Sequence, residues 1–260
     1  MKDDYTVEIL GLNYKTGNHY ILKDINWKIK KGEKWVLFGL NGCGKTTLLS
    51  IISGFRGGYA GRVNVFGEQY RKENVLFLRK KIAFVSSSFF DKIFANESII
   101  TIVLSGSCGA LGWANTISDA QRNKARRLLK KFNLSGREDH AYNWLSKGER
   151  QNVLLARAMM SEADMIVLDE PCSGLDVNSR NDFLNYLRDL TQDKEKTIIY
   201  VTHYADEILA EFTNTVLMHN GKIFKKGLSR DVLNSENFSA FLQQNVELSW
   251  EKGSMKLEYC

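Results

Sequence analysis

Short apolar runs, separated by polar turns, divide the chain into a series of expected strands. In segment 20–29, the apolar side chains of Ile25, Trp27 and Ile29 alternate with polar ones, which is the period of a strand with one buried face. Other runs are shorter and mainly apolar, as in strands at the centre of a sheet. These patterns predict strands at 7–12, 20–29, 35–38, 62–65, 82–85, 165–168, 198–201 and 215–217.

The middle of the chain, from about residue 89 to 160, follows a helical period instead. Segment 119–132 is the clearest case, because its apolar residues recur three and four positions apart and share one face of a helix. The residues on this face are Ala125, Leu128, Leu129 and Phe132. We expect this face to pack against a core.

Helices are also expected between the strands, at about 45–53 and 178–190. A strand, a helix and a second strand in succession form a β-α-β unit, whose strands lie parallel in one sheet. The order of segments therefore predicts an α/β fold with a largely parallel sheet and helices on both faces. In segment 246–260, two strand-like runs flank Gly253, which predicts a β-hairpin at a sheet edge or at a partner contact.

Composition places the chain among globular proteins, with 43% apolar and 25% charged residues. Its apolar runs are far shorter than the roughly 18 residues of a membrane span, and its first residues lack the apolar core of a signal peptide. The four cysteines lack the spacing of a zinc site, which is typical of free thiols in a reducing cytoplasm. The net charge of +6 comes from scattered Lys and Arg, so nucleic acid is not an expected partner.

The most specific motif lies between an expected strand and an expected helix. Residues 39–47 are Gly-Leu-Asn-Gly-Cys-Gly-Lys-Thr-Thr and match the pattern G-x-x-x-x-G-K-[ST] of phosphate-binding loops. Glycines let the backbone turn its N–H groups inward, where they and the helix N-terminus hold phosphates. Lys45 is expected to reach the outer phosphates, and the Thr46 hydroxyl to bind Mg²⁺. The expected nucleotide contacts are Gly39, Asn41, Gly42, Cys43, Gly44, Lys45, Thr46 and Thr47.

Two carboxylates directly follow the apolar run 165–168. The C-terminal end of a buried parallel strand is where such sheets place ligand chemistry. We expect Asp169 to hold Mg²⁺, directly or through water, and Glu170 to orient and deprotonate the attacking water. The chain lacks the Asn-Lys-x-Asp motif of small GTPases, which argues against that class.

Around these two motifs, the chain resembles the ABC (ATP-binding cassette) ATPase family. Residues 145–151, Leu-Ser-Lys-Gly-Glu-Arg-Gln, resemble the signature of that family, whose usual form is Leu-Ser-Gly-Gly-Gln. Residues 173–176 resemble its dimer-contact loop, His203 its switch histidine, and Tyr14 the aromatic residue that stacks on adenine. The resemblance covers about residues 5–230 and rests on ordered motifs with the family's spacing.

This resemblance implies a P-loop (RecA-like) core with an N-terminal antiparallel β portion and an inserted helical subdomain. It divides the chain into a cassette of residues 1–245 and a C-terminal tail of residues 246–260. Within the cassette, the core lobe spans about 1–88 and 161–245, and the helical subdomain about 89–160. The implied ligands are ATP and Mg²⁺.

The resemblance also implies a pair of subunits. In the family, the signature of one subunit completes the ATP pocket of the other, so Ser146 and Gly148 would contact the γ-phosphate in trans. Asp176 of the dimer-contact loop is likewise expected to bind the nucleotide. Residues 146–149 also match a capping box at a helix start, which is compatible with this role because a helix N-terminus attracts anions. The implied assembly is an ATP-induced dimer, in the simplest case a homodimer.

The catalytic residues that the resemblance implies are Lys45, Glu170 and His203.

Two positions depart from the family pattern. At the end of strand 82–85 the family has a glutamine that helps to bind Mg²⁺, whereas this chain has Ser87. A serine is too short for all of that role. Either Ser87 contributes little to the metal site, or the serine run 86–88 rearranges and places a hydroxyl on the metal. The other departure is Lys147, at a signature position usually held by Gly, which adds a positive charge near the trans phosphate.

Two functions remain open at this level. The first is the ATP-binding and ATP-hydrolysing subunit of a membrane transporter, at the inner face of the cell membrane, whose separate permease subunits dock on the helical subdomain near Ser87. The alternative is a soluble ABC ATPase that acts on ribosomes, nucleic acid or a cofactor-assembly complex. Ribosome-acting members usually carry two cassettes and DNA-repair members a long coiled coil, whereas this chain has one phosphate loop and no sustained heptad run. The transporter role is therefore the favoured prediction.

Overall fold

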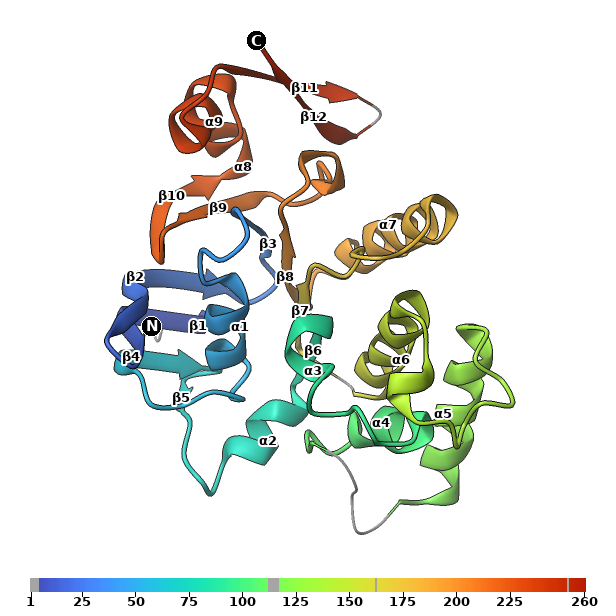
Figure 1. The fold of residues 1–260 in the computed structure, drawn as a ribbon. Helices are drawn as coiled ribbons and strands as arrows, with labels where there is room; N and C mark the ends of the chain where they lie inside the picture. Colours follow the sequence, from blue (N-terminus) through green and yellow to red (C-terminus); the bar gives the residue numbers. More distant parts are fainter. Residues whose placement is uncertain (1–4, 112–116, 162, 252) are drawn as a thin grey trace.

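The computed structural model describes residues 5–111, 117–161, 163–251 and 253–260. Residues 1–4, 112–116 and 162 of the predicted cassette, and residue 252 of the predicted tail, lie outside the described residues. Among the described residues, a six-stranded sheet in the order β10-β9-β3-β8-β7-β6 forms the centre (Figure 1). Its strands are β3 (Lys34–Phe38), β6 (Ile82–Ser86), β7 (Met165–Asp169), β8 (Thr197–Thr202), β9 (Asn214–His219) and β10 (Lys222–Leu228).

The parallel strands of this sheet end together at one edge. From β9 to β6 all neighbours are parallel, and only β10 is antiparallel to its neighbour β9. Every residue of β3 and β8 is buried, in agreement with the apolar runs 35–38 and 198–201 within them. At the C-terminal edge, Ser86 of β6 pairs with Asp169 of β7, and Phe38 of β3 pairs with Thr202 of β8. This register brings the segments that follow β3, β6, β7 and β8 to one place.

A second, antiparallel sheet has the order β2-β1-β4-β5. Its strands are β1 (Tyr5–Thr16), β2 (His19–Lys30), β4 (Ala60–Val65) and β5 (Glu68–Gln69). The predicted alternation in β2 is confirmed, because Ile25, Trp27 and Ile29 are all buried. Helix α1 (Lys45–Ile52) contacts both β2 and β7, and so joins the two sheets.

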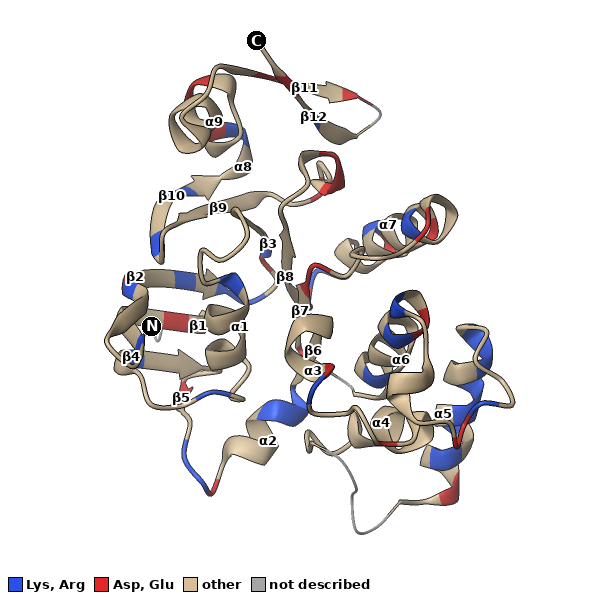
Figure 2. Cartoon of the chain, in the orientation of Figure 1, with Lys and Arg blue, Asp and Glu red and all other residues tan. Residues whose placement is uncertain are grey.

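The middle of the chain forms a helical lobe on the side of the central sheet away from the antiparallel sheet (Figure 1). It contains α4 (Ile99–Ser105), α5 (Asp119–Lys131), the 3-10 turn η1 (Tyr142–Trp144) and α6 (Lys147–Met160); α2 (Val75–Lys80) and α3 (Ser87–Phe90) precede it. The predicted apolar face of α5 is confirmed at Ala125 and Leu129, which are fully buried. Lys and Arg are spread over β2, α2, α5 and α6, with acidic residues between them (Figure 2).

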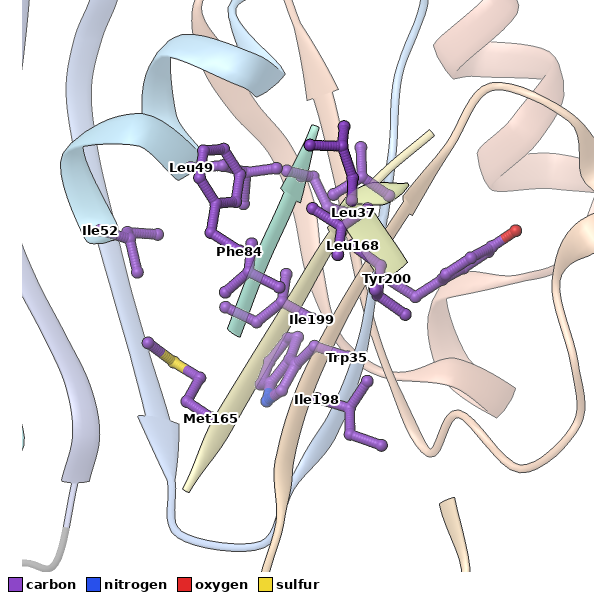
Figure 3. Close-up of a cluster of buried hydrophobic side chains, with 14 of the residues drawn as sticks. Trp35, Leu37, Leu49, Ile52, Phe84, Met165, Leu168, Ile198, Ile199 and Tyr200 are labelled. Carbon is purple, nitrogen blue, oxygen red and sulfur yellow. The ribbon is translucent and has the colours of Figure 1, made fainter. Parts of the chain in front are cut away.

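The core lies between α1 and the central sheet, where side chains from α1 and four strands meet (Figure 3). Leu49 and Ile52 of α1 face Phe84 of β6, and Ile199 of β8 lies behind them. These residues are at most 2% exposed. Burial of one such side chain contributes about 1.5–3 kcal/mol, so this layer fixes α1, and with it the loop before α1, against the sheet.

The C-terminal part begins after β8 with the 3-10 turn η2 (Ala205–Glu207), and α7 (Val177–Thr191) lies beside it. After β10 follow α8 (Ser229–Val232), α9 (Ser235–Leu242), β11 (Val246–Glu251) and β12 (Ser254–Tyr259). Strands β11 and β12 pair antiparallel as a two-stranded hairpin. Within the described ranges, none of the helices combines the length and the apolar character that a membrane crossing requires.

Candidate nucleotide-binding site

The loop that joins β3 to α1 has a backbone that glycine adopts most easily. Gly42 has a φ of 79° and Gly44 a φ of 102°, both in the left-handed region. At Gly39, a Cβ atom would lie 2.6 Å from the carbonyl oxygen of Met218, so a side chain has no room there. The geometry of the loop therefore requires the glycines that define the sequence motif.

This loop forms one wall of a cavity of about 400 Å³. The lining residues are Ile21, Asn41, Gly42, Gly44, Lys45, Thr46, Thr47, Ser88 and Glu170. Most of them are residues that the sequence assigns to the nucleotide. The side chain of Cys43 is instead buried beneath the loop, and this burial raises the pKa of its thiol.

Lys45 connects the loop with the acidic end of β7. Its side chain is buried, and Nζ donates hydrogen bonds to the carbonyl oxygens of Gly39 at 2.7 Å and Leu40 at 3.2 Å. The same Nζ lies 3.2 Å from Oε1 of Glu170. An ammonium held in this way is a fixed positive charge between the phosphate loop and the catalytic candidate Glu170, as the sequence predicts for a lysine that binds outer phosphates.

Asp169 is the centre of a cluster of oxygen donors. Its Oδ2 accepts hydrogen bonds from Oγ1 of Thr46 and from Oγ of Ser86, each at 2.7 Å. Its Oδ1 is buried and has no hydrogen-bond partner among the described residues. Burial raises the pKa of this carboxyl, and the two hydroxyl donors oppose that rise. An unpartnered buried carboxylate oxygen beside two hydroxyls fits Mg²⁺, which prefers oxygen ligands.

The protein offers few ligands to such an ion. No group of three or more His, Cys, Asp and Glu side chains with metal-binding geometry occurs in the described part of the chain. This agrees with Mg²⁺ sites that take one or two protein carboxylates and complete their shell with phosphate oxygens and water.

Ser86, and not Ser87, contacts the predicted metal ligand. Ser86 is the last residue of β6 and pairs with Asp169 across the sheet, so its side chain points to that carboxylate. Ser87 begins α3 and donates a hydrogen bond to Oε1 of Gln151 at 2.5 Å. Ser86 therefore lies beside the predicted metal ligand, and Ser87 ties β6 to the helical lobe. Which of the two possibilities for the serine run holds stays a prediction.

Glu170 has an unusual backbone conformation, with a φ of 50°. Positive φ is uncommon outside glycine, and such strain persists only where the surroundings hold it. Here the N–H of Glu170 donates to the carbonyl oxygen of Val201 at 3.0 Å. The carboxylate lies next to His203, with Oε1 3.2 Å from Nδ1, although Nδ1 makes no hydrogen bond within the described residues. Lys45, Glu170 and His203 are thus brought together, as the sequence predicts.

The signature residues lie at the start of α6 and do not line the cavity over the loop. Ser146 is the N-cap, and its capping box with Glu149 is confirmed: the Ser146 N–H donates to Oε2 of Glu149 at 2.9 Å, and the Glu149 N–H donates to Oγ of Ser146 at 3.3 Å. Gly148 follows in the first turn of the helix. The helix N-terminus is therefore formed in one chain but stays apart from the phosphate loop of that chain.

Lys147 lies along the dimer-contact loop of its own chain. Its Nζ donates to Oγ of Ser173 at 2.9 Å, and a Cβ at Gly174 would lie 2.5 Å from its Cδ. Asp176 at the end of this loop is the N-cap of α7, and its carboxylate accepts hydrogen bonds from the N–H groups of Asn178 and Ser179. The structure therefore gives Asp176 a capping role, and its predicted contact with nucleotide stays a prediction.

Tyr14 does not line the cavity over the loop. Its hydroxyl accepts a hydrogen bond from Nη1 of Arg56 at 3.0 Å, which lowers the pKa of the hydroxyl. Ile21 of β2 lines the cavity instead. The assignment of Tyr14 to adenine stays a prediction, and the structure adds Ile21 as a candidate for this contact.

Sequence reasoning missed Ile21 as a cavity residue and Gln151 as the partner of Ser87, and it named Ser86 only as one member of the serine run. Ser86 could have been found from the expected register, because strands 82–86 and 165–169 have equal length and end at one edge. Gln151 ends the signature run, but nothing in that run indicates its contact with Ser87, and Ile21 lies in an ordinary strand.

Comparison with known proteins places this geometry in context. Residues 22–173 match a protein-family model described as "ABC transporter". The ABC transporter ATP-binding protein YlmA of Bacillus subtilis is 34% identical over 95% of this chain and 94% of its own length. The molybdate import ATP-binding protein MolC of Haemophilus influenzae is 32% identical over 92% of this chain and 88% of its own length.

Solved structures agree with these relatives. An inward-facing metal-chelate type ABC transporter is similar with a TM-score of 0.71 and 27% identity, over 98% of this chain and 97% of its own. An ATP-binding cassette solved as a dimer with ADP and phosphate is similar with a TM-score of 0.69 and 25% identity, over 85% of this chain and 98% of its own.

Proposed function

The chain belongs to the ABC transporter family as an ATP-binding subunit, and from this premise we propose that it hydrolyses ATP with Glu170 as the general base. The observation that carries the proposal is the position of Oε1 of Glu170, 3.2 Å from both Nζ of Lys45 and Nδ1 of His203. A carboxylate at this place, on the wall of the loop cavity, can take a proton from a water molecule that attacks the outer phosphate.

The other residues bind and orient. Mg²⁺ supplies charge neutralisation at the phosphates, and Thr46, Ser86 and Asp169 are the residues that would hold it. Lys45 holds the outer phosphates by charge, while the glycine loop turns its backbone toward them. We assign His203 to the orientation of Glu170, because its ring lies against that carboxylate.

Phosphate release by the purified subunit tests this mechanism. Glu170→Gln keeps the size of the side chain but removes the base, so we expect the rate to fall by about 100-fold or more while ATP binding persists. Lys45→Ala removes the phosphate contact, so ATP affinity and the rate are both expected to fall. Glu73→Gln, at an exposed acid of another segment, is the matched control. A Glu170→Gln rate equal to wild type would contradict the assignment.

We further propose that a second copy of the subunit completes the site. The capped N-terminus of α6 at Ser146 is formed but does not line the cavity over the loop of its own chain. A helix N-terminus attracts anions, so it can bind the outer phosphate of a nucleotide held by another chain. The similar cassette solved as a dimer with ADP and phosphate supports this arrangement.

The transporter role leads to a proposal on partners. Relatives such as MolC are named as import subunits, and we propose that this chain likewise serves an import system at the inner face of the membrane, bound to separate permease subunits. Purification of the tagged subunit from native membranes, with mass spectrometry of bound proteins, tests this. A membrane protein with several spans is the expected partner. Ribosomal proteins, or no partner at all, would favour the alternative of a soluble ATPase.

A further inference from the structure

The C-terminal hairpin is bonded directly to the segment that follows His203. The N–H of Met255 donates to the carbonyl oxygen of Ile208 at 3.1 Å, and the N–H of Ala210 donates to the carbonyl oxygen of Gly253 at 3.0 Å. Between them, Leu209 and Ser254 form an antiparallel bridge. These backbone bonds give the hairpin a fixed register on residues 208–210.

Burial shows that this contact is part of the core. Met255 and Leu209 are fully buried and belong to the main hydrophobic cluster. The other strand of the hairpin is anchored to α9, because the N–H of Val246 donates to Oγ of Ser239 and the N–H of Leu248 donates to Oγ of Ser235, each at 3.0 Å. The hairpin is therefore a fixed wall and not a loose extension.

The same segment is held from the opposite side by Glu207, which is 2% exposed. Its carboxylate accepts hydrogen bonds from Thr202 at 2.5 Å, Tyr200 at 2.9 Å and Nε of Arg180 at 3.1 Å. Arg180 lies on α7, the helix that Asp176 caps. Residues 203–210, here called the switch loop, are thus clamped between α7 and the hairpin.

His203 borders the space between the switch loop and the hairpin. This cavity has a volume of about 350 Å³, and its lining includes His203, Tyr204 and Asp206 from the loop and Lys256, Glu258 and Tyr259 from the hairpin. The ring of Tyr204 packs on the imidazole, with 4.1 Å between the ring centres. A shift of the hairpin would therefore be transmitted to the residue beside Glu170.

We propose that the C-terminal hairpin is a positioning element for catalysis, which holds the switch loop so that His203 stays against Glu170. The inference rests on the proposed ATP hydrolysis. Its physical basis is that a displacement of about 1 Å at a catalytic group can cost about 100-fold in rate. Leu40 of the phosphate loop also lines the cavity beside the hairpin. No hairpin residue lines the cavity over the loop, so we expect the hairpin to act on the orientation of the base and not on the binding of ATP.

The test releases the hairpin in two ways. One variant is the full-length subunit with Met255→Asp, and the other is a chain that ends after Asn245. Met255→Asp places a carboxylate at a fully buried position of β12. We expect both variants to lower kcat by about tenfold while KM for ATP stays within about twofold, because only the orientation step is lost. Met255→Leu conserves the apolar contact and is expected to restore the rate. Glu247→Ala, at an exposed position of β11, is the matched control.

A second comparison shows whether the effect passes through His203. In the His203→Ala background, Met255→Asp is expected to lower kcat by less than about twofold, since coupled residues do not add. An equal loss with and without His203 would overturn the proposal. An unchanged kcat in both hairpin variants would also overturn it, because the hairpin would then have no effect on catalysis. A loss of ATP binding in both variants would overturn it as well, because the hairpin would then support the whole domain.

Hydrogen exchange separates this inference from the proposed function. Release of the hairpin is expected to speed the exchange of the amides in residues 203–210 but not of those in β3. If both variants show this faster exchange but the wild-type subunit hydrolyses no ATP, the proposed function is contradicted and the docking of the hairpin stands. Active wild type with unchanged exchange in both variants would contradict the docking alone.

Discussion

Ser86 donates a hydrogen bond to Oδ2 of Asp169 at 2.7 Å, across a pair of parallel strands in register. Thr46 donates to the same oxygen, so Oδ2 accepts two hydrogen bonds. The other oxygen, Oδ1, is buried and has no hydrogen-bond partner among the described residues. The site offers a cation two hydroxyls and one carboxylate. The length of the side chain at the end of β6 therefore matters less than its position on the strand.

The first prediction separates Ser86 from Ser87. Ser86→Ala removes a hydroxyl beside the metal position, so we expect a raised Mg²⁺ requirement and a hydrolysis rate lowered by about tenfold or more. Ser87→Ala loses only the bond to Gln151 and is expected to change the rate by less than about tenfold. Steady-state hydrolysis across a Mg²⁺ titration measures both. The reverse order of effects would show that Ser87 carries the metal contact.

The second prediction concerns Lys147, which stands where the family has glycine. Its ammonium lies by Ser173, at the face where a partner's phosphates would bind. Lys147→Met keeps the aliphatic chain over Gly174 but removes the charge, so ATP-induced dimerisation is expected to weaken by about two- to fivefold, as for an exposed ion pair. The difference should shrink at high salt. Lys147→Arg is the charge-preserving control. Tighter dimerisation of Lys147→Met would contradict the expected attraction between the Lys147 ammonium and the partner's phosphates.

The third prediction concerns Cys43. Burial raises the pKa of its thiol, so little thiolate is present near neutral pH, and alkylation there should be slow and should accelerate as the pH rises. Exposed Cys260 should react first without loss of activity. Later modification of Cys43 should abolish hydrolysis, because an adduct disturbs the loop, and bound ATP should protect. Peptide mapping with parallel activity measurements tests this. Equal inhibition of Cys43→Ser would assign the effect to another cysteine.

The central strands could be predicted because a strand that is buried on both faces has a continuous apolar run in the sequence. The apolar runs of β3, β7 and β8 identify all three, and their C-terminal ends carry the phosphate loop, the acid pair and His203. Strand β10 was missed, since its sequence Lys-Ile-Phe-Lys-Lys-Gly-Leu is mostly exposed and lacks a clear period. It forms because the edge of β9 offers free backbone groups for pairing. This cause lies in the tertiary structure and not in the local sequence of β10.

Side-chain partners could be predicted less well than backbone positions. The motif spacing brings Lys45, Glu170 and His203 together, but no pattern indicates that Tyr14 bonds Arg56 or that Lys147 reaches Ser173. Both contacts depend on loops whose course is set by packing. The capping box at Ser146 was predictable because all of its atoms lie within one helical turn.

The central claim is that two copies of this chain enclose ATP, and trapping the dimer tests it most directly. Glu170→Gln retains the phosphate loop and the residues around Asp169 but lacks the base, so bound ATP should persist. Size-exclusion chromatography with light scattering is expected to show a dimer with ATP and Mg²⁺ and a monomer without nucleotide. Adding Lys45→Ala in the same chain should abolish the dimer, because the phosphates lose their contact. A Glu170→Gln subunit that binds ATP yet stays monomeric at high protein concentration would contradict the account.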